Sequence, residues 1–280
     1  MERPSLTARF RSIDDISPGD ILAMHALFAG YYENASIETF IADLSKKSGA
    51  ILVHEKGGGP LRGFSTVTTV ALPEAGEGAI GVFSGDTILH HEYWGDRSLK
   101  DGFVRYMLKL KLSNPLRRVY WLLISKGYKT YLLMAKNFVS YYPRHDRPND
   151  PKLERLVRAY CDTLFPGKYD AKGKVLDFGE TSQKLRGEVA PITTQDRLRE
   201  PAIRYFEARN PEWERGVELP CIGEVSFSLL MPYLDKQRRR SSTPPALTES
   251  ESFAAMAHVP NAEQDARSVE RVWPRAGGMS

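Results

Sequence analysis

The segment His90–Leu99 combines histidine, carboxylate, aromatic and basic side chains where the sequence predicts that a strand ends and a helix begins. The first backbone N–H groups of a helix have no partner within the helix and lie at the positive end of its dipole. Such a turn can therefore bind an anion, and Arg97 and Lys100 add positive charge beside it. A capped helix without any ligand is the simpler alternative.

A second candidate is Asp86, which lies in the predicted buried strand segment Phe83-Ser84-Gly85-Asp86-Thr87. A charge inside a buried sheet is costly unless it has a function. A carboxylate with a raised pKa can take a proton from a nucleophile, so Asp86 is the first candidate for a general base and Glu92 the second. The alternative is a structural carboxylate bonded to Thr87 or to a backbone amide.

Several motifs that would specify a reaction are absent. The sequence contains neither a G-x-x-x-x-G-K-[ST] phosphate loop nor a G-x-G-x-x-G turn after a strand. Gly81–Asp86 reads GVFSGD and lacks the G-x-S-x-G order of α/β hydrolases. His91 and Glu92 do not begin an H-E-x-x-H motif, and the adjacent His90 and His91 would point in opposite directions at a strand end. We therefore expect no metal site.

Composition indicates an ordinary globular protein. The 280 residues are 41% hydrophobic, and no apolar run is long enough for a transmembrane helix. Met1–Arg11 is polar and charged, so we expect no secretory signal. The two cysteines, Cys161 and Cys221, are too few for a disulfide framework or a thiolate zinc site. A reducing, cytoplasmic location is expected.

Positive charge is concentrated in one part of the sequence. The stretch from Asp96 to Arg147 holds twelve Lys and Arg and three acidic residues, a net charge of +9, whereas the whole chain has a net charge of +4. Such a block suggests a phosphate-bearing ligand or an acidic partner protein. A solvated basic face is the alternative. We expect no nucleic-acid partner, because no aromatic-interleaved platform or DNA-binding motif accompanies the block.

Apolar spacing predicts two helices, three strands, a helix, a strand and a further helix over the first half of the chain. Ser17-Pro18-Gly19-Asp20 opens the first helix with a serine cap and a proline in the first turn. The other expected elements are a helix from Ser36, strands at Ala50–His54, Leu61–Leu72 and Ala79–Leu89, a helix capped by Ser98 with Asp101, a buried strand at Val119–Ser125 and a helix from Tyr128 to about Tyr142. The strand–helix–strand order implies a parallel strand pair.

The second half of the sequence is less regular. Helices are expected at Pro151–Phe165 and Leu198–Arg209, with a strand within Gly216–Phe227. After about Asp235 the periodicity is lost, and residues 236–280 predict a disordered tail because they lack the apolar surface to offset their ordering entropy. We expect a domain over residues 1–150, a mostly helical extension packed on it over 151–235, and the tail.

This order of elements resembles the GNAT superfamily of acyl-CoA-dependent N-acyltransferases over roughly Ser12 to Arg147, about half of the chain. The resemblance implies an α/β fold with a mixed central sheet flanked by helices. It also implies transfer of an acyl group from acetyl-CoA or another acyl-CoA, without a metal, to a small-molecule or peptide amine. Gly85 would then permit the bulge that separates the strands around the thioester.

In that family a turn of the form Arg/Gln-x-x-Gly-x-Gly/Ala holds the diphosphate of coenzyme A with its amides. The resemblance places this cradle at Gly95, Asp96, Arg97, Ser98, Leu99 and Lys100, and it places backbone donors for the pantetheine or the thioester carbonyl near Ile88 and Leu89. Arg97 and Leu99 replace two of the family's glycines. This departure favours a changed diphosphate grip through Arg97 or a different donor, such as an acidic acyl carrier protein that docks on the basic block.

The family also carries a tyrosine on the helix after its fifth strand, which protonates the departing thiolate. The resemblance assigns that role to Tyr131, followed by Asn137-Phe138 where the family has Gly-Phe. A core tyrosine with a satisfied hydroxyl is the alternative, and Tyr128 is a rival for the role. The leading hypothesis is thus an N-acyltransferase with Asp86 as base and Tyr131 as acid. A catalytically inactive binding module of the same fold is the alternative.

Overall fold

The computed structural model describes residues 3–32, 36–179, 192–227, 229 and 231, so the predicted tail at 236–280 lies outside the described residues. Its strands are β1 (Leu6–Ser12), β2 (Gly49–Glu55), β3 (Leu61–Ala71), β4 (Ile80–Leu89), β5 (Val119–Ser125), β6 (Tyr141–Tyr142), β7 (Tyr169–Asp170), β8 (Val175–Leu176) and β9 (Leu219–Glu224). Its α-helices are α1 (Pro18–Tyr31), α2 (Ile37–Leu44), α3 (Ser98–Ser113), α4 (Tyr128–Asn137), α5 (Pro151–Leu164), α6 (Thr194–Arg199) and α7 (Pro201–Arg209).

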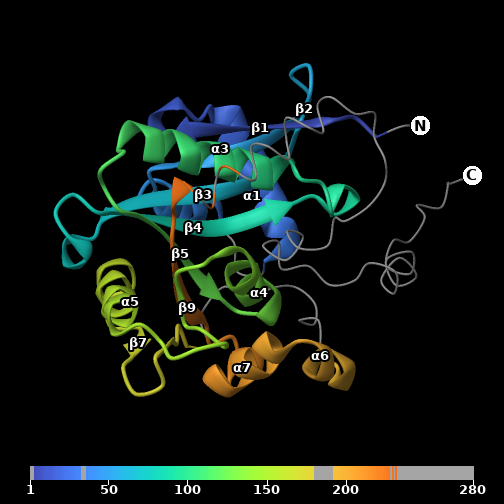
Figure 1. Ribbon diagram of the computed structural model, residues 1–280. Coiled ribbons are helices and arrows are strands. Elements are labelled where there is room, and N and C mark those ends of the chain that lie inside the picture. Colours follow the sequence, from blue (N-terminus) through green and yellow to red (C-terminus); the bar gives the residue numbers. More distant parts are fainter. Residues whose placement is uncertain (1–2, 33–35, 180–191, 228, 230, 232–280) are drawn as a thin grey trace, which may run out of the picture.

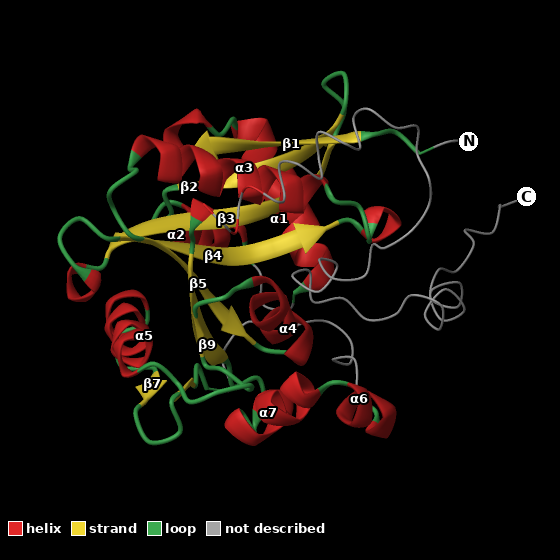
Figure 2. Ribbon diagram, viewed as in Figure 1, coloured by secondary structure: helices red, strands yellow, loops and turns green. Residues whose placement is uncertain are grey.

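A seven-stranded mixed sheet forms the centre of the protein, with the strand order β1-β2-β3-β4-β5-β9-β6 (Figures 1 and 2). Its neighbouring strands are antiparallel except for β4 and β5, which are parallel. The helix α3 connects these two strands, as the strand–helix–strand order predicts. The expected fold class, a mixed α/β sheet flanked by helices, is confirmed.

Helices cover both faces of the sheet because alternate strand residues are apolar on both sides. On β2, Ile51 and Val53 pack into the cluster beneath α3, whereas Ala50 and Leu52 pack against α1 and α2. Farther along the sheet, α4 and α7 cover the α3 face, and α5 covers the opposite face beside β5 and β9. Strand alternation therefore decides which side chains of the sheet lie under α3 and which lie under α1 and α2.

The local sequence signals explain the helix starts. The Ser17 hydroxyl accepts a hydrogen bond from the amide of Asp20 at 3.0 Å, and that of Ser36 accepts one from Thr39 at 3.2 Å. The prediction for α4 is wrong at its end, because the helix stops at Asn137 and the chain re-enters the sheet as β6. In addition, α6 precedes the helix expected at Leu198–Arg209.

The extension beyond residue 150 supplies a strand to the sheet. The strand β9 lies between β5 and β6 and pairs with both in antiparallel register. Its predicted location within Gly216–Phe227 is confirmed. Because β5 has β4 on one side and β9 on the other, the C-terminal part of the described chain takes part in the core of the fold.

Candidate active site

The parallel strands β4 and β5 separate part-way along their length. Their register runs from Ile80–Val119 to Phe83–Leu122. Beyond that point β4 continues to Leu89, while the rest of β5 pairs with β9. Figure 1 shows the arrowheads of the two strands pointing in different directions. The separation leaves one edge of β4 without a strand partner among the described residues, and an unpaired edge of this kind can pair with an extended ligand.

A β-bulge lies on β4 where this separation begins. Ser65 pairs with Thr87 and Val67 pairs with Ser84, so two residues of β4, Gly85 and Asp86, lie opposite Thr66. A Cβ added to Gly85 would lie 2.5 Å from the hydroxyl oxygen of Thr66. Glycine is thus the residue that permits this close approach. The bulge expected at Gly85 is confirmed.

Asp86 is half-buried on the bulge, and burial raises the pKa of its carboxyl group. Lys47 and Lys126 lower this pKa in part, and Asp43 raises it further. The Thr87 hydroxyl contacts Ser65 and the carbonyl of Gly85 instead of Asp86. Within the described chain the hydrogen bond to the carboxylate comes from the amide of Asp86 itself. A raised pKa and the lack of a side-chain partner are the properties expected of a general base.

A second buried carboxylate, Glu218, was not selected from the sequence. It directly precedes β9, is 6% exposed, and forms an ion pair with Lys126 at 3.4 Å. Burial raises the pKa of Glu218, and the negative charge of Asp86 raises it further. Both carboxylates also raise the pKa of Tyr32 at the end of α1. The sequence did carry a signal, since Glu218 is an isolated charge in the apolar run Val217–Ile222.

The turn before α3 differs from the predicted anion cradle. Gly95 has a φ of 86°, which glycine adopts readily. The amide of Asp96 donates to the carbonyl of Tyr93 at 2.9 Å, and the amide of Ser98 donates to the Asp96 carboxylate at 2.7 Å. The expectation that Ser98 caps the helix is wrong, because Arg97 is the N-cap residue and the Asp96 side chain takes the first helical amide. An acidic side chain therefore occupies part of the site expected for a diphosphate.

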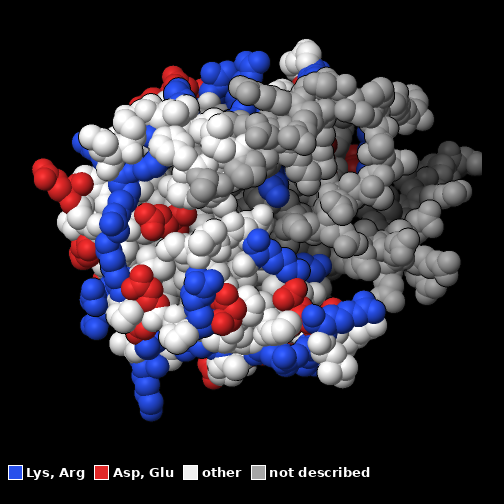
Figure 3. Space-filling view, viewed as in Figure 1, with Lys and Arg blue, Asp and Glu red and all other residues white. Residues whose placement is uncertain are grey.

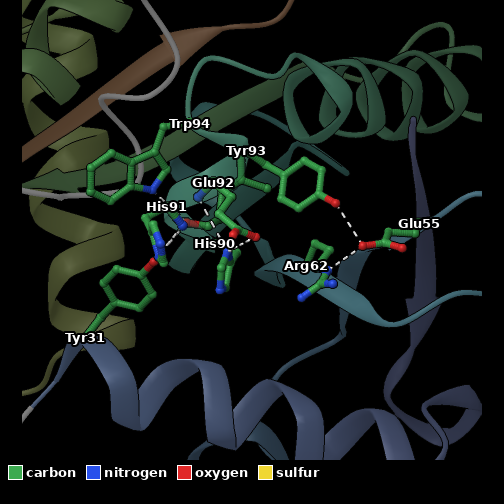
Figure 4. Close-up of polar contacts among 9 residues, drawn as sticks. Tyr31, Glu55, Arg62, His90, His91, Glu92, Tyr93 and Trp94 are labelled. Atoms are coloured by element: carbon green, nitrogen blue, oxygen red, sulfur yellow. Dashed lines mark hydrogen bonds and ion pairs between the residues drawn. The ribbon is translucent and has the colours of Figure 1, made fainter. Parts of the chain in front are cut away.

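Side chains from three other elements hold this turn in place (Figure 4). The amide of His91 donates to the Tyr31 hydroxyl at 2.9 Å, and the Tyr93 hydroxyl donates to Glu55 at 2.8 Å. Arg62 donates to the same Glu55 oxygen at 2.7 Å. This network connects the turn to α1, β2 and β3, so its backbone is fixed without a ligand.

The remaining predicted residues at the end of β4 and in the following turn are Glu92, Ile88 and Leu89, and they lie in different surroundings. Glu92 is exposed, and its carboxylate lies 3.5 Å from the His90 ring (Figure 4). The amide of His90 donates to Arg62 on β3 at 2.7 Å, so strand alternation directs the N–H of Ile88 toward β3 and that of Leu89 toward the open side. Of the two predicted backbone donors, only Leu89 thus faces the separation.

Tyr131 is fully buried on α4. Its hydroxyl donates to the carbonyl of Pro143 at 3.1 Å, and its ring packs against Tyr205 and Phe206 of α7. Burial raises the pKa of this hydroxyl. Tyr128 is half-buried at the start of α4, and burial raises its pKa as well. Asp86 thus acts electrostatically on Glu218 and Tyr32, whereas the Tyr131 hydroxyl makes a structural hydrogen bond.

The basic block is dispersed in the folded protein. Lys126 pairs with Glu218, Lys136 with Glu200, and Arg144 with Asp146. Figure 3 shows Lys and Arg interspersed with acidic and uncharged residues on the face that it displays. Glu200 and Glu218, which are distant in the sequence, therefore neutralise part of the block, together with Asp146 inside it.

The order of helices and strands decides the fold type. Two helices precede β2, β3 and β4, and the bulged β4 leads through a turn into α3, the parallel β5 and α4. The fold is GNAT-like. No protein-family model matches the sequence, and no curated protein is significantly similar to it.

Solved structures with partial similarity include several acyltransferases. A GNAT family N-acetyltransferase from Escherichia coli in complex with CoA is 16% identical, with a TM-score of 0.33 over 45% of this chain and 67% of its own. A probable N-acyltransferase from Enterococcus faecalis is 14% identical, with a TM-score of 0.35 over 48% of this chain and 33% of its own. An IAA acetyltransferase from Bacillus cereus is 11% identical, with a TM-score of 0.31 over 49% and 80%. The similarity spans about a third of the Enterococcus chain.

The two parts of the expected coenzyme A differ in how well the residues of this region would hold them. The open edge of β4 fits a pantetheine arm, whose amides can pair with a strand edge. In the turn at Gly95–Leu99 the amides of Asp96 and Ser98 are used within the protein, and the Asp96 carboxylate repels an anion, so these two amides do not fit a diphosphate. In the described ranges no group of three or more His, Cys, Asp or Glu is arranged to hold a metal ion. No described helix has the length and apolar character needed to span a membrane.

Proposed function

We propose that this protein transfers an acyl group from a pantetheine thioester to an amine at the separation of β4 and β5. One observation carries the proposal. The bulge at Gly85–Asp86 holds a half-buried carboxylate whose pKa is raised by burial, and it lies where β4 stops pairing with β5. A base with a raised pKa and an open strand edge beside it are the two components that direct aminolysis of a thioester requires.

The donor supplies an activated acyl group, and the residues of the chain align and deprotonate the acceptor. The amine attacks the thioester carbonyl carbon, a C–N bond forms and the C–S bond breaks. Asp86 accepts the proton that the nitrogen loses, and the pantetheine leaves as the thiolate. The N–H of Leu89, directed to the open side of β4, is the donor for the arm or the developing oxyanion.

A direct assay tests this function. Purified protein is incubated with acetyl-CoA and with longer acyl-CoAs, each with a set of amine acceptors, and both thiol release and the mass of the acylated product are measured. Acyl transfer that requires both substrates supports the proposal. Absence of transfer from every acyl-CoA and from acylated carrier protein would refute it.

A second candidate is a GNAT-like binding module without catalysis. It is favoured by the turn before α3, in which the amides of Asp96 and Ser98 already donate hydrogen bonds within the turn. A protein that does not bind a diphosphate there has no need for its amides to stay free. The two candidates differ in the behaviour of Asp86, because a binding module that does not turn over thioesters has no use for a base.

Replacing Asp96 by alanine is expected to tighten acyl-CoA binding by about three- to tenfold. Removal of the carboxylate frees the Ser98 amide and removes a repelling charge at the start of α3, and one charge at a helix N-terminus contributes about 0.3–1 kcal/mol in addition to the hydrogen bond. Dissociation constants measured by calorimetry check this result. Asp101→Ala, one turn into the same helix, is the control for a general change in charge. Weaker binding by Asp96→Ala would show that the carboxylate supports the site.

Replacing Tyr131 by phenylalanine is expected to lower the free energy of unfolding by about 1–2 kcal/mol, because the buried carbonyl of Pro143 loses its donor. We expect kcat to stay within a factor of two. Thermal denaturation and steady-state kinetics measure the two effects separately. A fall in kcat of tenfold or more at unchanged stability would instead assign the proton-donor role to Tyr131.

A further inference from the structure

The first strand of the sheet has one edge without a strand partner. β1 is the outermost strand, and in the described sheet it pairs with β2 alone (Figures 1 and 2). The amide of Lys56 donates to the carbonyl of Ser5 at 2.9 Å, so the odd-numbered residues of this segment direct their backbone groups toward β2. The backbone groups of Leu6, Ala8 and Phe10 therefore face the other side, which we call the open edge of β1.

The amides at the open edge of β1 lack acceptors. Arg105 of α3 donates to the carbonyl of Ala8 at 3.0 Å, which confirms that this carbonyl points away from β2. Within the described part of the chain no group accepts a hydrogen bond from the amides of Leu6, Ala8 and Phe10. Leu6 and Ala8 are only 7% and 3% exposed, so little of either residue contacts water. Because buried backbone N–H groups are nearly always paired, an additional strand is the simplest source of the missing acceptors.

Three arginines place positive charge around this edge. Arg9 and Arg11 alternate with the apolar residues of β1 and are exposed on the face away from α3, whereas Arg105 lies at the edge itself. None of the three forms an ion pair with a described carboxylate. Asp15, which follows β1, accepts a hydrogen bond from the Ser12 hydroxyl at 2.5 Å instead. Since guanidinium groups bind carboxylates strongly, the open edge favours an acidic segment.

The same charges argue against a second copy of β1 as the partner. When two such edges pair in antiparallel fashion, the residues with outward-facing backbone groups bond to each other. Arg9 and Arg11 would then lie opposite the arginines of the other copy, and like charges directly opposite each other destabilise a sheet. A suitable partner instead carries carboxylates at alternate positions, on one face of an extended segment.

The sequence contains such a segment at residues 247–253, which lie outside the described residues. It reads LTESESF, so Glu249 and Glu251 are two residues apart. The segment also holds threonine and phenylalanine, which are enriched in strands. Glu263 and Asp265 have the same spacing, but they lie among asparagine and alanine, which are depleted in strands. The first pair of acids is therefore the better match to the open edge of β1.

The described part of the chain brings this segment within reach. The Phe227 ring lies 5.6 Å from the Lys111 Nζ on α3, and the ring of Tyr106, five residues earlier on the same helix, lies 4.5 Å from that of Phe10. Five residues of helix span about 7.5 Å. The twenty residues between Phe227 and Leu247 can extend to about 66 Å, so the connection is long enough.

We propose that residues 247–253 pair with the open edge of β1 as an additional antiparallel strand, in which Glu249 lies opposite Arg11 and Glu251 lies opposite Arg9. Both pairs then occupy positions at which the backbone groups point away from each other and the side chains are closest. For this segment the proposal replaces the expectation of disorder. Two strands, β2 and β3, separate β1 from β4, so this surface is independent of the proposed function.

Amide hydrogen exchange of the full chain, resolved by residue with NMR, tests the proposal. We expect protected amides at Ala8 and Phe10, and we expect the double variant Glu249→Lys/Glu251→Lys to accelerate their exchange by at least tenfold. The amide of Arg9 points toward β2, so its exchange should stay the same and report that the sheet is intact. Unprotected amides at Ala8 and Phe10 in the unmodified chain would overturn the proposal.

The double variant Glu263→Lys/Asp265→Lys is the matched control, because it makes the same change in charge at the same spacing. It should leave the exchange of the β1 amides unchanged. Equal acceleration by both double variants, or acceleration by neither, would overturn the proposal. Protection that falls on dilution of the protein would assign the open edge to a second copy of the chain and would overturn it as well.

Reversal of one charge pair tests the register. Arg11→Glu is expected to accelerate exchange of the Phe10 amide by at least tenfold, and Glu249→Arg in the same chain should restore the rate to within threefold of that of the unmodified protein. Arg11 is exposed, so its replacement leaves the core unchanged. An Arg11→Glu variant with full protection, or a double variant without restored protection, would overturn the proposed pairing.

Discussion

Replacing Asp86 by asparagine is expected to lower kcat/KM for acyl transfer by about 10²–10⁴-fold, the usual contribution of a positioned general base. Asparagine keeps the size of the side chain and its place on the bulge but cannot accept a proton. In the unmodified protein, kcat/KM should rise with pH as Asp86 loses its proton. Because burial raises the pKa of Asp86, this rise should occur at a higher pH than for an exposed aspartate.

The same substitution is expected to stabilise the protein at pH 7. A carboxyl group whose pKa is raised by folding contributes stability below its unfolded pKa and loses that contribution as the pH rises through its folded pKa. Ionised Asp86 therefore destabilises the folded state at neutral pH. Asparagine removes the buried charge, so the thermal midpoint should rise at pH 7 and should change little near pH 3.

Kinetics and thermal denaturation at pH 3 and pH 7 together check this prediction. Asp14→Asn, an exposed aspartate in the connection before α1, is the control and should alter neither quantity. A stable Asp86→Asn variant with full activity would remove Asp86 from the mechanism. A loss of both activity and stability would identify Asp86 as a structural carboxylate, which is the alternative that its sequence context left open.

The sequence alone predicted those structural features that depend on residues adjacent in the chain. Ser17 with Pro18 specifies the start of α1, and Gly85 beside a charge within a strand predicted the bulge. The strand β1 was missed although Leu6 and Ala8 alternate with the exposed Arg9 and Arg11. This alternation is short and lies at an edge of the sheet, where one polar face is tolerated.

Other features depend on pairing between distant segments. Glu218 meets Lys126 and Asp86 only because β9 inserts beside β5, and spacing along the chain does not encode that pairing. Likewise, the register between β3 and β4 places Thr66, whose hydroxyl has no hydrogen-bond partner among the described residues, opposite the bulge at Gly85 and Asp86. The Asp96 contact is local by contrast, since a carboxylate two residues before a helical amide is a common cap. That pattern, had it been used, would have predicted that the Asp96 carboxylate accepts the hydrogen bond from the Ser98 amide.

Ending the chain at residue 150 is expected to prevent stable folding. The shortened chain lacks β9, so the last residues of β5 lose their antiparallel partner and β6 loses its only strand neighbour in the described sheet. It also lacks α5 and α7, whose side chains Leu156 and Phe206 are fully buried against the sheet. Each such buried side chain contributes about 2–5 kcal/mol, so losing these two alone is comparable with the total stability of a typical domain, about 5–15 kcal/mol.

Circular dichroism and urea denaturation of the 1–150 fragment and of the full chain measure this effect, and the fragment should show no cooperative transition. Ile222→Ala is a milder test, because it removes one buried side chain of β9 and is expected to cost about 2–5 kcal/mol. Leu198→Ala, at a position that is 76% exposed, should change stability by less than about 0.5 kcal/mol. A cooperatively folded 1–150 fragment would show instead that the first half is an independent domain. The strand β9 would then add to a sheet that is already stable without it. The site around Asp86 would also form without Glu218, which lies outside the fragment.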